Sequence, residues 1–273
     1  KRQINKLDEA ISKGWELLKK GQSSEMAVIE TIKILEDSPL FNAGKGSVFN
    51  NEGNVENDAS IMRGNDLNAG ASSGTSNVKN PITLAANIMN HSEHVFLSGK
   101  GAENFAKNRN LEIVNNEYFH TKFRYNQLLH KKGEDKYGTV GCVAIDVNGN
   151  IVAGTSTGGM TNKKWGRIGD SPIIGAGTYA NNSTCGISST GSGEYFIRTV
   201  AAYQVSSLLE NHEYDLTTAM SKVIHEKIGG IGGDGGMIGI DKNSNISMDF
   251  NTAGMYRAFV NKNGIKQILL YKK

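Results

Sequence analysis

A threonine that follows a glycine at the start of a predicted strand is the residue best suited to nucleophilic chemistry. The sequence reads Gly138-Thr139-Val140-Gly141, directly after a charged segment at 131–136 that is predicted to be a solvated linker. A threonine hydroxyl is a weak nucleophile unless a base lies beside it, and an N-terminal threonine carries that base in its own α-amine. Because α-amines titrate near neutral pH, a useful fraction is uncharged there. The pattern predicts a nucleophile at Thr139, produced by breaking the Gly138–Thr139 bond.

Two further segments carry groups that can hold an amino acid and a developing negative charge. Arg167 and Asp170 lie three residues apart in the sequence GRIGD. The guanidinium is a planar fork for a carboxylate and Asp170 can pair with an ammonium group, so together they can grip an amino acid's α-carboxylate and α-amine. Thr190 and Gly191 stand at a predicted strand-to-helix junction, where a hydroxyl and a backbone N–H can donate to an oxyanion.

Two glycine-rich motifs suggest other chemistry, but their context argues against it. Residues 154–158 read GTSTG and match the G-x-S-x-G nucleophile elbow of α/β-hydrolases. That elbow needs a helix directly after it, whereas residues 159–164 have no helical period of apolar residues. Residues 230–235 match a dinucleotide-binding fingerprint, yet they follow a predicted helix and precede a strand, the reverse of the required order. Both motifs are interpreted as structural.

The elements around these residues are predicted from periodicity, caps and turns. Asn148-Gly149 is a hairpin turn signal, so the strand that ends at Thr157 returns beside the strand that Thr139 opens. Because antiparallel pairs alternate with grouped helices, the chain is assigned to the α+β class, with sheets covered by helix layers. The predicted helices are 4–18, 26–35, 81–89, 101–109, 117–130, 195–209 and 216–228, and the predicted strands are 48–49, 55–62, 94–97, 140–147, 151–157, 184–190, 236–241, 246–250, 255–260 and 265–271.

Composition excludes several classes of protein. The 273 residues include 30 Lys and Arg against 27 Asp and Glu, so no strongly basic surface is expected and nucleic acid is excluded as a partner. No apolar run is long enough to span a membrane and no signal peptide is visible, which predicts a cytoplasmic protein and leaves the periplasm open. Cys142 and Cys185 are predicted to be buried free thiols. Of 33 glycines, 21 follow residue 138, which indicates close backbone approach in the second half.

In this order, the motifs resemble those of the plant-type (type 2) asparaginase and isoaspartyl peptidase family of N-terminal nucleophile (Ntn) hydrolases. The resemblance implies a four-layer αββα sandwich with two packed antiparallel sheets between helix layers. It also implies a single domain that cuts itself into an α-subunit, 1–138 with a linker at about 125–138, and a β-subunit, 139–273, paired as an (αβ)₂ assembly. The segments that carry the resemblance are 39–44, 58–62, 138–141, 155–159, 166–172, 190–194 and 229–236.

The resemblance also implies a role for each site residue. Thr139 is the expected nucleophile, supported by the Thr157 hydroxyl and approached by Asn42. Arg167 and Asp170 would grip the substrate, Thr190 and Gly191 would form the oxyanion hole, and Gly193 would line the substrate site. No cofactor is expected for catalysis. A structural sodium ion is expected on backbone oxygens of Leu35, Glu36, Ser38, Phe41, Ala43 and Lys45.

The substrates implied are β-aspartyl (isoaspartyl) dipeptides and L-asparagine, hydrolysed through an acyl-enzyme. A sister activity, glycosylasparaginase, is the alternative, and an unprocessed binding protein without enzymatic activity is a third. Two departures from the family bear on self-cleavage. The His-Gly-Gly motif that family members carry in their first strand does not occur in residues 1–273, and the segment between Arg124 and Gly138 is short for the family.

Overall fold

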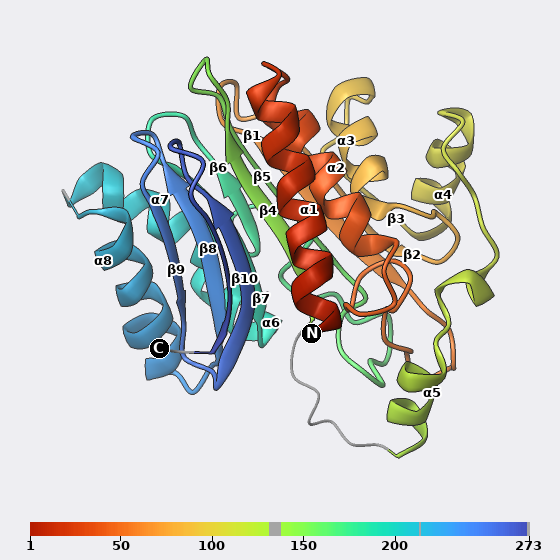
Figure 1. Ribbon diagram of the computed structural model, residues 1–273. Coiled ribbons are helices and arrows are strands. Elements are labelled where there is room, and N and C mark those ends of the chain that lie inside the picture. Colours follow the sequence, from red (N-terminus) through yellow and green to blue (C-terminus); the bar gives the residue numbers. More distant parts are fainter. Residues whose placement is uncertain (131–137, 213, 272–273) are drawn as a thin grey trace.

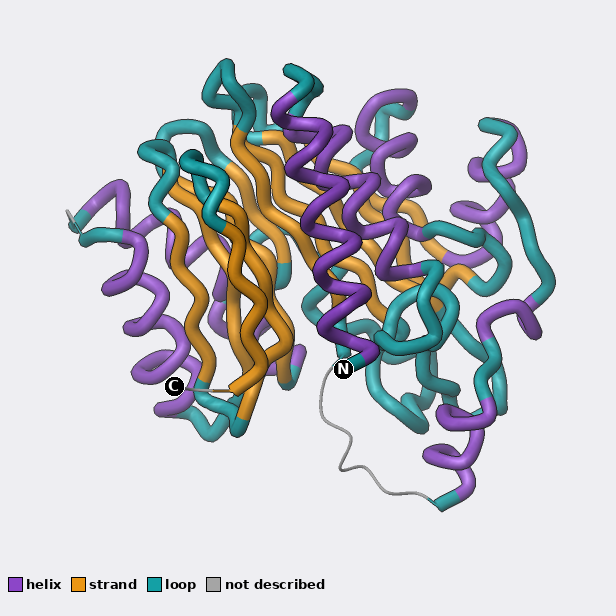
Figure 2. The backbone as a smooth tube through the Cα atoms, viewed as in Figure 1, coloured by secondary structure: helices purple, strands orange, loops and turns teal. Residues whose placement is uncertain are grey.

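Two β-sheets lie face to face between two layers of helices in the computed structural model, which describes residues 1–130, 138–212 and 214–271 (Figures 1 and 2). Within these residues the first sheet has the order β3-β2-β1-β5-β4 and the second β6-β7-β8-β9. Neighbouring strands are antiparallel except for β2 and β3, which are parallel. The strands of the first sheet are β1 (Asn57–Arg63), β2 (Ala69–Thr75), β3 (Phe96–Ser98), β4 (Val140–Ile145) and β5 (Ile151–Thr157).

The second sheet and a separate hairpin complete the strand layers. The second sheet contains β6 (Thr178–Ala180), β7 (Cys185–Gly191), β8 (Gly235–Asp241) and β9 (Ile246–Phe250). The strands β10 (Gly254–Val260) and β11 (Lys266–Tyr271) pair only with each other among the described residues.

Helices cover the outer face of each sheet (Figure 1). Helices α1 (Arg2–Lys19), α2 (Ser24–Glu36) and α3 (Pro81–His91) lie over the first sheet. Helices α6 (Gly193–Thr199), α7 (Ala201–Asn211) and α8 (Leu216–Ser221) lie over the second, followed by the π-helix η2 (Lys222–Ile228). To the right of the first sheet in Figure 1 lie helix α4 (Gly99–Asn108) and helix α5 (Lys122–Leu129), with the 3₁₀ turn η1 (Asn116–Phe119) between them in the sequence.

Three apolar cores separate the four layers. One core joins α1, α2 and α3 to the first sheet and includes Val28, Ile32 and Ile82. A second lies between the sheets and includes Ile151 from one sheet and Ile240 from the other. A third joins the second sheet to its helices. The α+β class and the predicted αββα sandwich are therefore confirmed.

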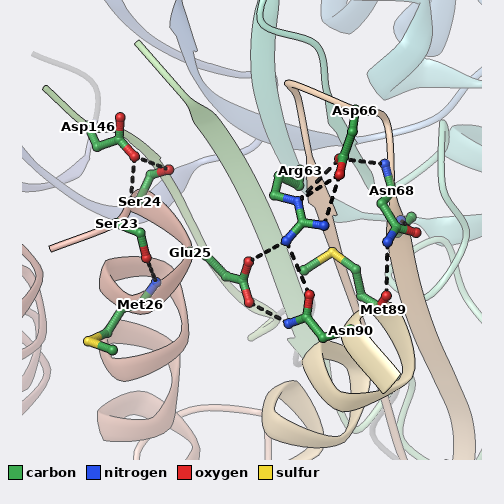
Figure 3. A network of polar contacts seen from close by, with 11 residues as sticks. Ser23, Ser24, Glu25, Met26, Arg63, Asp66, Asn68, Met89, Asn90 and Asp146 are labelled. Carbon is green, nitrogen blue, oxygen red and sulfur yellow. Dashed lines mark hydrogen bonds and ion pairs between the residues drawn. The ribbon is translucent and has the colours of Figure 1, made fainter. Parts of the chain in front are cut away.

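A polar network at one end of the sandwich fixes the helix layer to the first sheet (Figure 3). The Ser23 hydroxyl accepts from the Met26 N–H and caps α2. Glu25, in the first turn of that helix, forms an ion pair of 3.1 Å with Arg63 of β1 and accepts from the Asn90 amide at 2.6 Å. One charged cluster thus ties α2, β1 and the last turn of α3 together.

Several predicted elements differ from the structure. The hairpin predicted within 47–62 is confirmed only at its turn, where Phe49 and Val55 form an isolated antiparallel bridge, because β1 pairs instead with β2 and β5. Strand β2 was not predicted, since its sequence AGASSGT consists of small residues and has a single β-branched residue, the threonine at its end. The helix predicted at 195–209 is broken by Val200, whose φ of 48° is left-handed.

The remaining expectations concern the linker, the cysteines and the membrane. Helix α5 extends to Leu129, so the predicted linker at about 125–138 begins inside a helix; residues 131–137, with their predicted charged segment, lie outside the described residues. Cys142 and Cys185 are buried free thiols, as predicted. In the described part of the chain, none of the helices combines the length and apolar character needed to cross a membrane.

Candidate active site

Thr139 and Thr157 meet at the end of the first sheet. Thr139 directly precedes β4, and the register in which Val140 faces Ser156 places Thr139 beside the last residue of β5. Their Oγ1 atoms are 3.0 Å apart. The Gly159 N–H donates to the Thr157 hydroxyl at 3.1 Å, which leaves the Thr157 proton available for Thr139. In this geometry the Thr157 hydroxyl can donate to Thr139 Oγ1 and hold it in place, while the Thr139 hydroxyl gives its proton to another group.

Asn42 connects three segments that surround this pair. Its backbone N–H donates to the Gly138 carbonyl at 2.9 Å, and its backbone carbonyl accepts from the Gly158 N–H at 3.0 Å. Its side-chain amide donates to the Gly159 carbonyl at 2.7 Å and its Oδ1 accepts from the Val48 N–H at 2.9 Å. With four hydrogen bonds and a buried side chain, Asn42 holds the residue before Thr139 and the residues after Thr157 in one arrangement.

Gly138 lies too close to Asn42 to carry a side chain. A Cβ at Gly138 would be 2.8 Å from the Asn42 Cβ, well inside contact distance. The carbonyl that precedes Thr139 is held by a fixed N–H donor, so any negative charge that develops on this oxygen would be stabilised.

Arg167 and Asp170 lie together beside Gly193, the first residue of α6. A Cβ at Gly193 would be 3.0 Å from Arg167 Nη2 and 2.9 Å from Asp170 Oδ1. The guanidinium and the carboxylate therefore both lie next to the Gly193 backbone. Asp170 is buried, and its Oδ2 atom has no hydrogen-bond partner among the described residues. Burial raises the pKa of Asp170 to about 7, against the lowering effect of nearby N–H groups and Arg167.

Thr190 and Gly191 end β7, the strand of the second sheet that leads into α6. The register pairs them with Gly236 and Gly235 of β8. The Thr190 hydroxyl oxygen is buried and makes no hydrogen bond within the described ranges. The site therefore contains two buried oxygens with unused hydrogen-bonding capacity, one at Thr190 and one at Asp170.

A cavity of about 960 Å³ reaches part of this site. Thr139 and Thr190 line it, together with α1, β4, β8 and β10, whereas Arg167 and Asp170 do not. Strands β4 and β10 each border it with an edge that has no strand partner in the described part of the chain. The open space thus adjoins residues Thr139 and Thr190 rather than Arg167 and Asp170, the pair of residues called the clamp.

Two charged residues near Arg167 and Asp170 were not predicted from the sequence. Lys163 is buried and donates through Nζ to the Glu56 carbonyl at 3.1 Å. Glu194 binds Arg167 with two hydrogen bonds, each 2.9 Å long. Glu194 lies in the segment that suggested Thr190, but a glutamate in the first turn of a helix is commonplace, so the sequence carried no signal for its partner.

Ser156, the serine of the rejected elbow motif, points away from the site. Its side chain is fully buried and its hydroxyl donates to Glu36 Oε1 at 2.6 Å. Burial raises the pKa of Glu36 to about 8, partly offset by that hydrogen bond. Ser156 is therefore structural, as interpreted from the sequence.

The loop expected to hold sodium folds back on the end of α2. The Lys45 N–H donates to the Glu36 carbonyl at 2.7 Å, and the Lys45 ammonium lies 5.2 Å from the Tyr118 ring centre, over its face. Backbone carbonyls of a closed loop are hard oxygen donors, which suit a hard cation. No cluster of His, Cys, Asp or Glu among the described residues is arranged to hold a metal ion.

The sandwich, with a threonine directly before the edge strand β4, is the arrangement of the N-terminal nucleophile hydrolases. A family model described as asparaginase matches residues 1–270. The chain is 45% identical over 273 residues to an isoaspartyl peptidase of Escherichia coli, covering 94% of this chain and 85% of the relative. It is 42% identical to a putative isoaspartyl peptidase/L-asparaginase of Dictyostelium discoideum (98% and 92% covered) and 41% identical to a plant-type L-asparaginase of Pyrococcus furiosus (97% and 91%). The chain belongs to the asparaginase family of hydrolases.

Proposed function

We propose that this protein is a self-cleaving threonine amidohydrolase that hydrolyses β-aspartyl dipeptides and L-asparagine through an acyl-enzyme on Thr139. The observation that carries the proposal is the pair of Thr139 and Thr157 hydroxyls at 3.0 Å. The names of the related isoaspartyl peptidases and asparaginases support the choice of substrate over glycosylated asparagine.

Self-cleavage is the first reaction. The Thr139 oxygen attacks the Gly138 carbonyl carbon, whose oxygen already accepts from the Asn42 N–H. The C–N bond between the two residues then breaks, the nitrogen takes the hydroxyl proton, and Gly138 is held on Thr139 as an ester. Water hydrolyses this ester, which leaves a carboxylate on Gly138 and a free α-amine on Thr139.

The freed amine makes Thr139 an effective nucleophile. It takes the proton of the Thr139 hydroxyl, whose oxygen attacks the side-chain carbonyl carbon of the substrate. The Thr190 hydroxyl and the Gly191 N–H donate to the oxyanion, while Arg167 and Asp170 hold the α-carboxylate and α-amine and Gly193 leaves room between them. The proton passes to the leaving nitrogen, which departs as ammonia or an amino acid. Water then releases aspartate and restores the hydroxyl.

No cofactor takes part in these steps. We propose that backbone oxygens of Leu35, Glu36, Ser38, Phe41, Ala43 and Lys45 hold a structural sodium ion. The donor chemistry of this loop supports the proposal. Bound there, the cation would stiffen the loop that carries Asn42. We further propose that two processed protomers pair as an (αβ)₂ assembly.

The test is intact mass and a denaturing gel of the purified protein, followed by activity measurements. We expect two fragments with a new N-terminus at Thr139, and none for Thr139→Ala. The processed protein should then release aspartate from β-Asp-Leu and ammonia from asparagine. A wild-type chain that stays intact after long incubation contradicts the proposal, and dominant cleavage of a GlcNAc–asparagine conjugate replaces it with the glycosylasparaginase alternative.

A further inference from the structure

Glu194 occupies one edge of the guanidinium that the proposed function assigns to the substrate. Arg167 Nε donates to Glu194 Oε1 and Nη2 donates to Oε2, both at 2.9 Å. This is a side-on bidentate pair, the strongest arrangement between the two groups. It uses one hydrogen of Nη2, so the end-on edge formed by Nη1 and the other Nη2 hydrogen stays available.

The surrounding backbone fixes the orientation of that available edge. A Cβ at Gly169 would lie 2.8 Å from Arg167 Nη1, and one at Gly193 would lie 3.0 Å from Nη2. A side chain at Gly169 or at Gly193 would therefore displace the guanidinium, so the two glycines leave room for it in this orientation. Near Gly159, whose N–H binds Thr157, an added Cβ would lie 3.6 Å from Nη1, so the same edge borders the nucleophile's support.

Arg167 lies between two carboxylates that compete for it. Asp170 Oδ1 and Arg167 Nη2 both border Gly193, so the guanidinium needs little movement to pair with Asp170. In such a pair, Arg167 and Asp170 would bind each other instead of the substrate. The Asp170 carboxylate would then be neutralised and could no longer bind the substrate's ammonium group. Glu194 offers Arg167 a partner on the Nε–Nη2 edge, and its side chain is about half exposed whereas Asp170 is buried.

We propose that Glu194 is a positioning residue that holds the Arg167 guanidinium away from Asp170, with its end-on edge presented to the α-carboxylate of the substrate. The inference rests on the proposed function, since it assigns a substrate to Arg167 and Asp170. Glu194 itself touches no reacting atom. Its removal should weaken substrate binding and leave the chemical step on Thr139 nearly unchanged.

The matched control is Asp66, which makes the same side-on contact with Arg63 (Figure 3). There Nε and Nη2 donate to the two carboxylate oxygens at 3.2 and 2.9 Å. Asp66 belongs to the network at the N-terminus of α2, on segments that carry no site residue. Asp66→Asn thus removes an equivalent ion pair elsewhere on the surface.

The experiment compares wild type, Glu194→Gln and Asp66→Asn in two measurements: KM and kcat for β-Asp-Leu, and the Kd for L-aspartate by calorimetry. For Glu194→Gln we expect KM and Kd to rise about tenfold, the size of effect typical for a hydrogen bond to a charged group. We expect kcat to stay within about threefold and self-cleavage to be unchanged. Asp66→Asn should match wild type, and Glu194→Asp should recover part of the loss.

Unchanged KM and Kd in Glu194→Gln, with an active wild type, overturn this inference alone. Lower values in that variant also overturn it, because they would make Glu194 a competitor for Arg167 rather than its support. A rise of the same size in Asp66→Asn assigns the effect to general loss of ion pairs. A wild type that neither binds L-aspartate nor hydrolyses β-Asp-Leu overturns the proposed function together with the inference.

Discussion

At the residue scale, the proposed function places a buried acid where it must be charged to bind substrate. Asp170 lies in a buried position that favours its neutral form, and its Oδ2 has no partner among the described residues. Solvation that the carboxylate loses on folding is restored only in part by Arg167 and nearby N–H groups. The substrate's ammonium group would supply the rest. Under the proposed function, the protein therefore gives up some stability at Asp170 in order to bind an α-amine.

Replacing Asp170 by Asn should separate its effect on stability from its role in substrate binding. A carboxyl whose pKa rises to about 7 on folding holds its proton more tightly in the folded state. It therefore lowers stability progressively as pH rises from its unfolded pKa, about 4, towards 7. We expect Asp170→Asn to abolish hydrolysis yet to unfold at higher urea concentration than wild type at pH 8. The difference should shrink as the pH is lowered to 5.

Urea unfolding of both proteins at pH 5, 6, 7 and 8 measures this difference. Arg63 lowers the pKa of Asp66, so Asp66→Asn should change stability in the opposite direction, by a small amount because Asp66 is exposed to solvent. Equal stability of Asp170→Asn and wild type at every pH would show that Asp170 is not strained by burial.

At the scale of elements, a chain of hydroxyl groups fixes how the two sheets meet near Thr139 and Thr157. Thr155 of β5 hydrogen-bonds with Ser188 of β7 at 2.7 Å and with Thr178 of β6 at 2.6 Å. Ser60 of β1 extends the chain by donating to Thr178 at 2.8 Å. Directed hydrogen bonds between sheets allow less sliding than apolar contacts do, so the chain sets the position of Thr157 relative to Thr190.

Thr155→Val removes the central hydroxyl and keeps the shape of the side chain. Because Ser188 loses a buried partner and Thr178 an acceptor, we expect the free energy of unfolding to fall by about 1–3 kcal/mol in urea titrations. Ser72 provides the control, since its buried hydroxyl has no partner among the described residues. Ser72→Ala should change stability much less. If both variants behave alike, the hydroxyl chain does not hold the sheets in place.

The same elements show what the sequence could and could not predict. Strands β4 and β5 were predicted with their hairpin because Asn148-Gly149 is a local turn signal. Strand β2 was missed because its small residues serve the packing of α3 against the sheet, which is a tertiary property. Residues 166–170 suggested the clamp, but the pairing of Arg167 with Glu194 spans 27 residues and has no local signature.

For the whole molecule, the excess of glycine after residue 138 has a partial explanation in packing. Gly193 lies against Arg167 and Asp170, and Gly158 lies against Asn42 and Ser47. The cut before Thr139 would not divide the fold into two bodies. Strand β1 from the first part pairs with β5 from the second along six register positions, from Asp58–Thr157 to Arg63–Val152. The core beneath α2 likewise contains Ile32 from one part and Val152 from the other.

We therefore expect the two fragments to remain one particle after cleavage. Separating them would break the backbone hydrogen bonds between β1 and β5 and expose the shared apolar core to water, at a free-energy cost comparable to unfolding either part. Native mass spectrometry of processed protein should detect both fragments in every particle, although a denaturing gel separates them. The same spectrum counts protomers and so tests the (αβ)₂ assembly. Fragments that elute separately without denaturant would mean that the 1–138 part folds independently, which the shared sheet and core argue against.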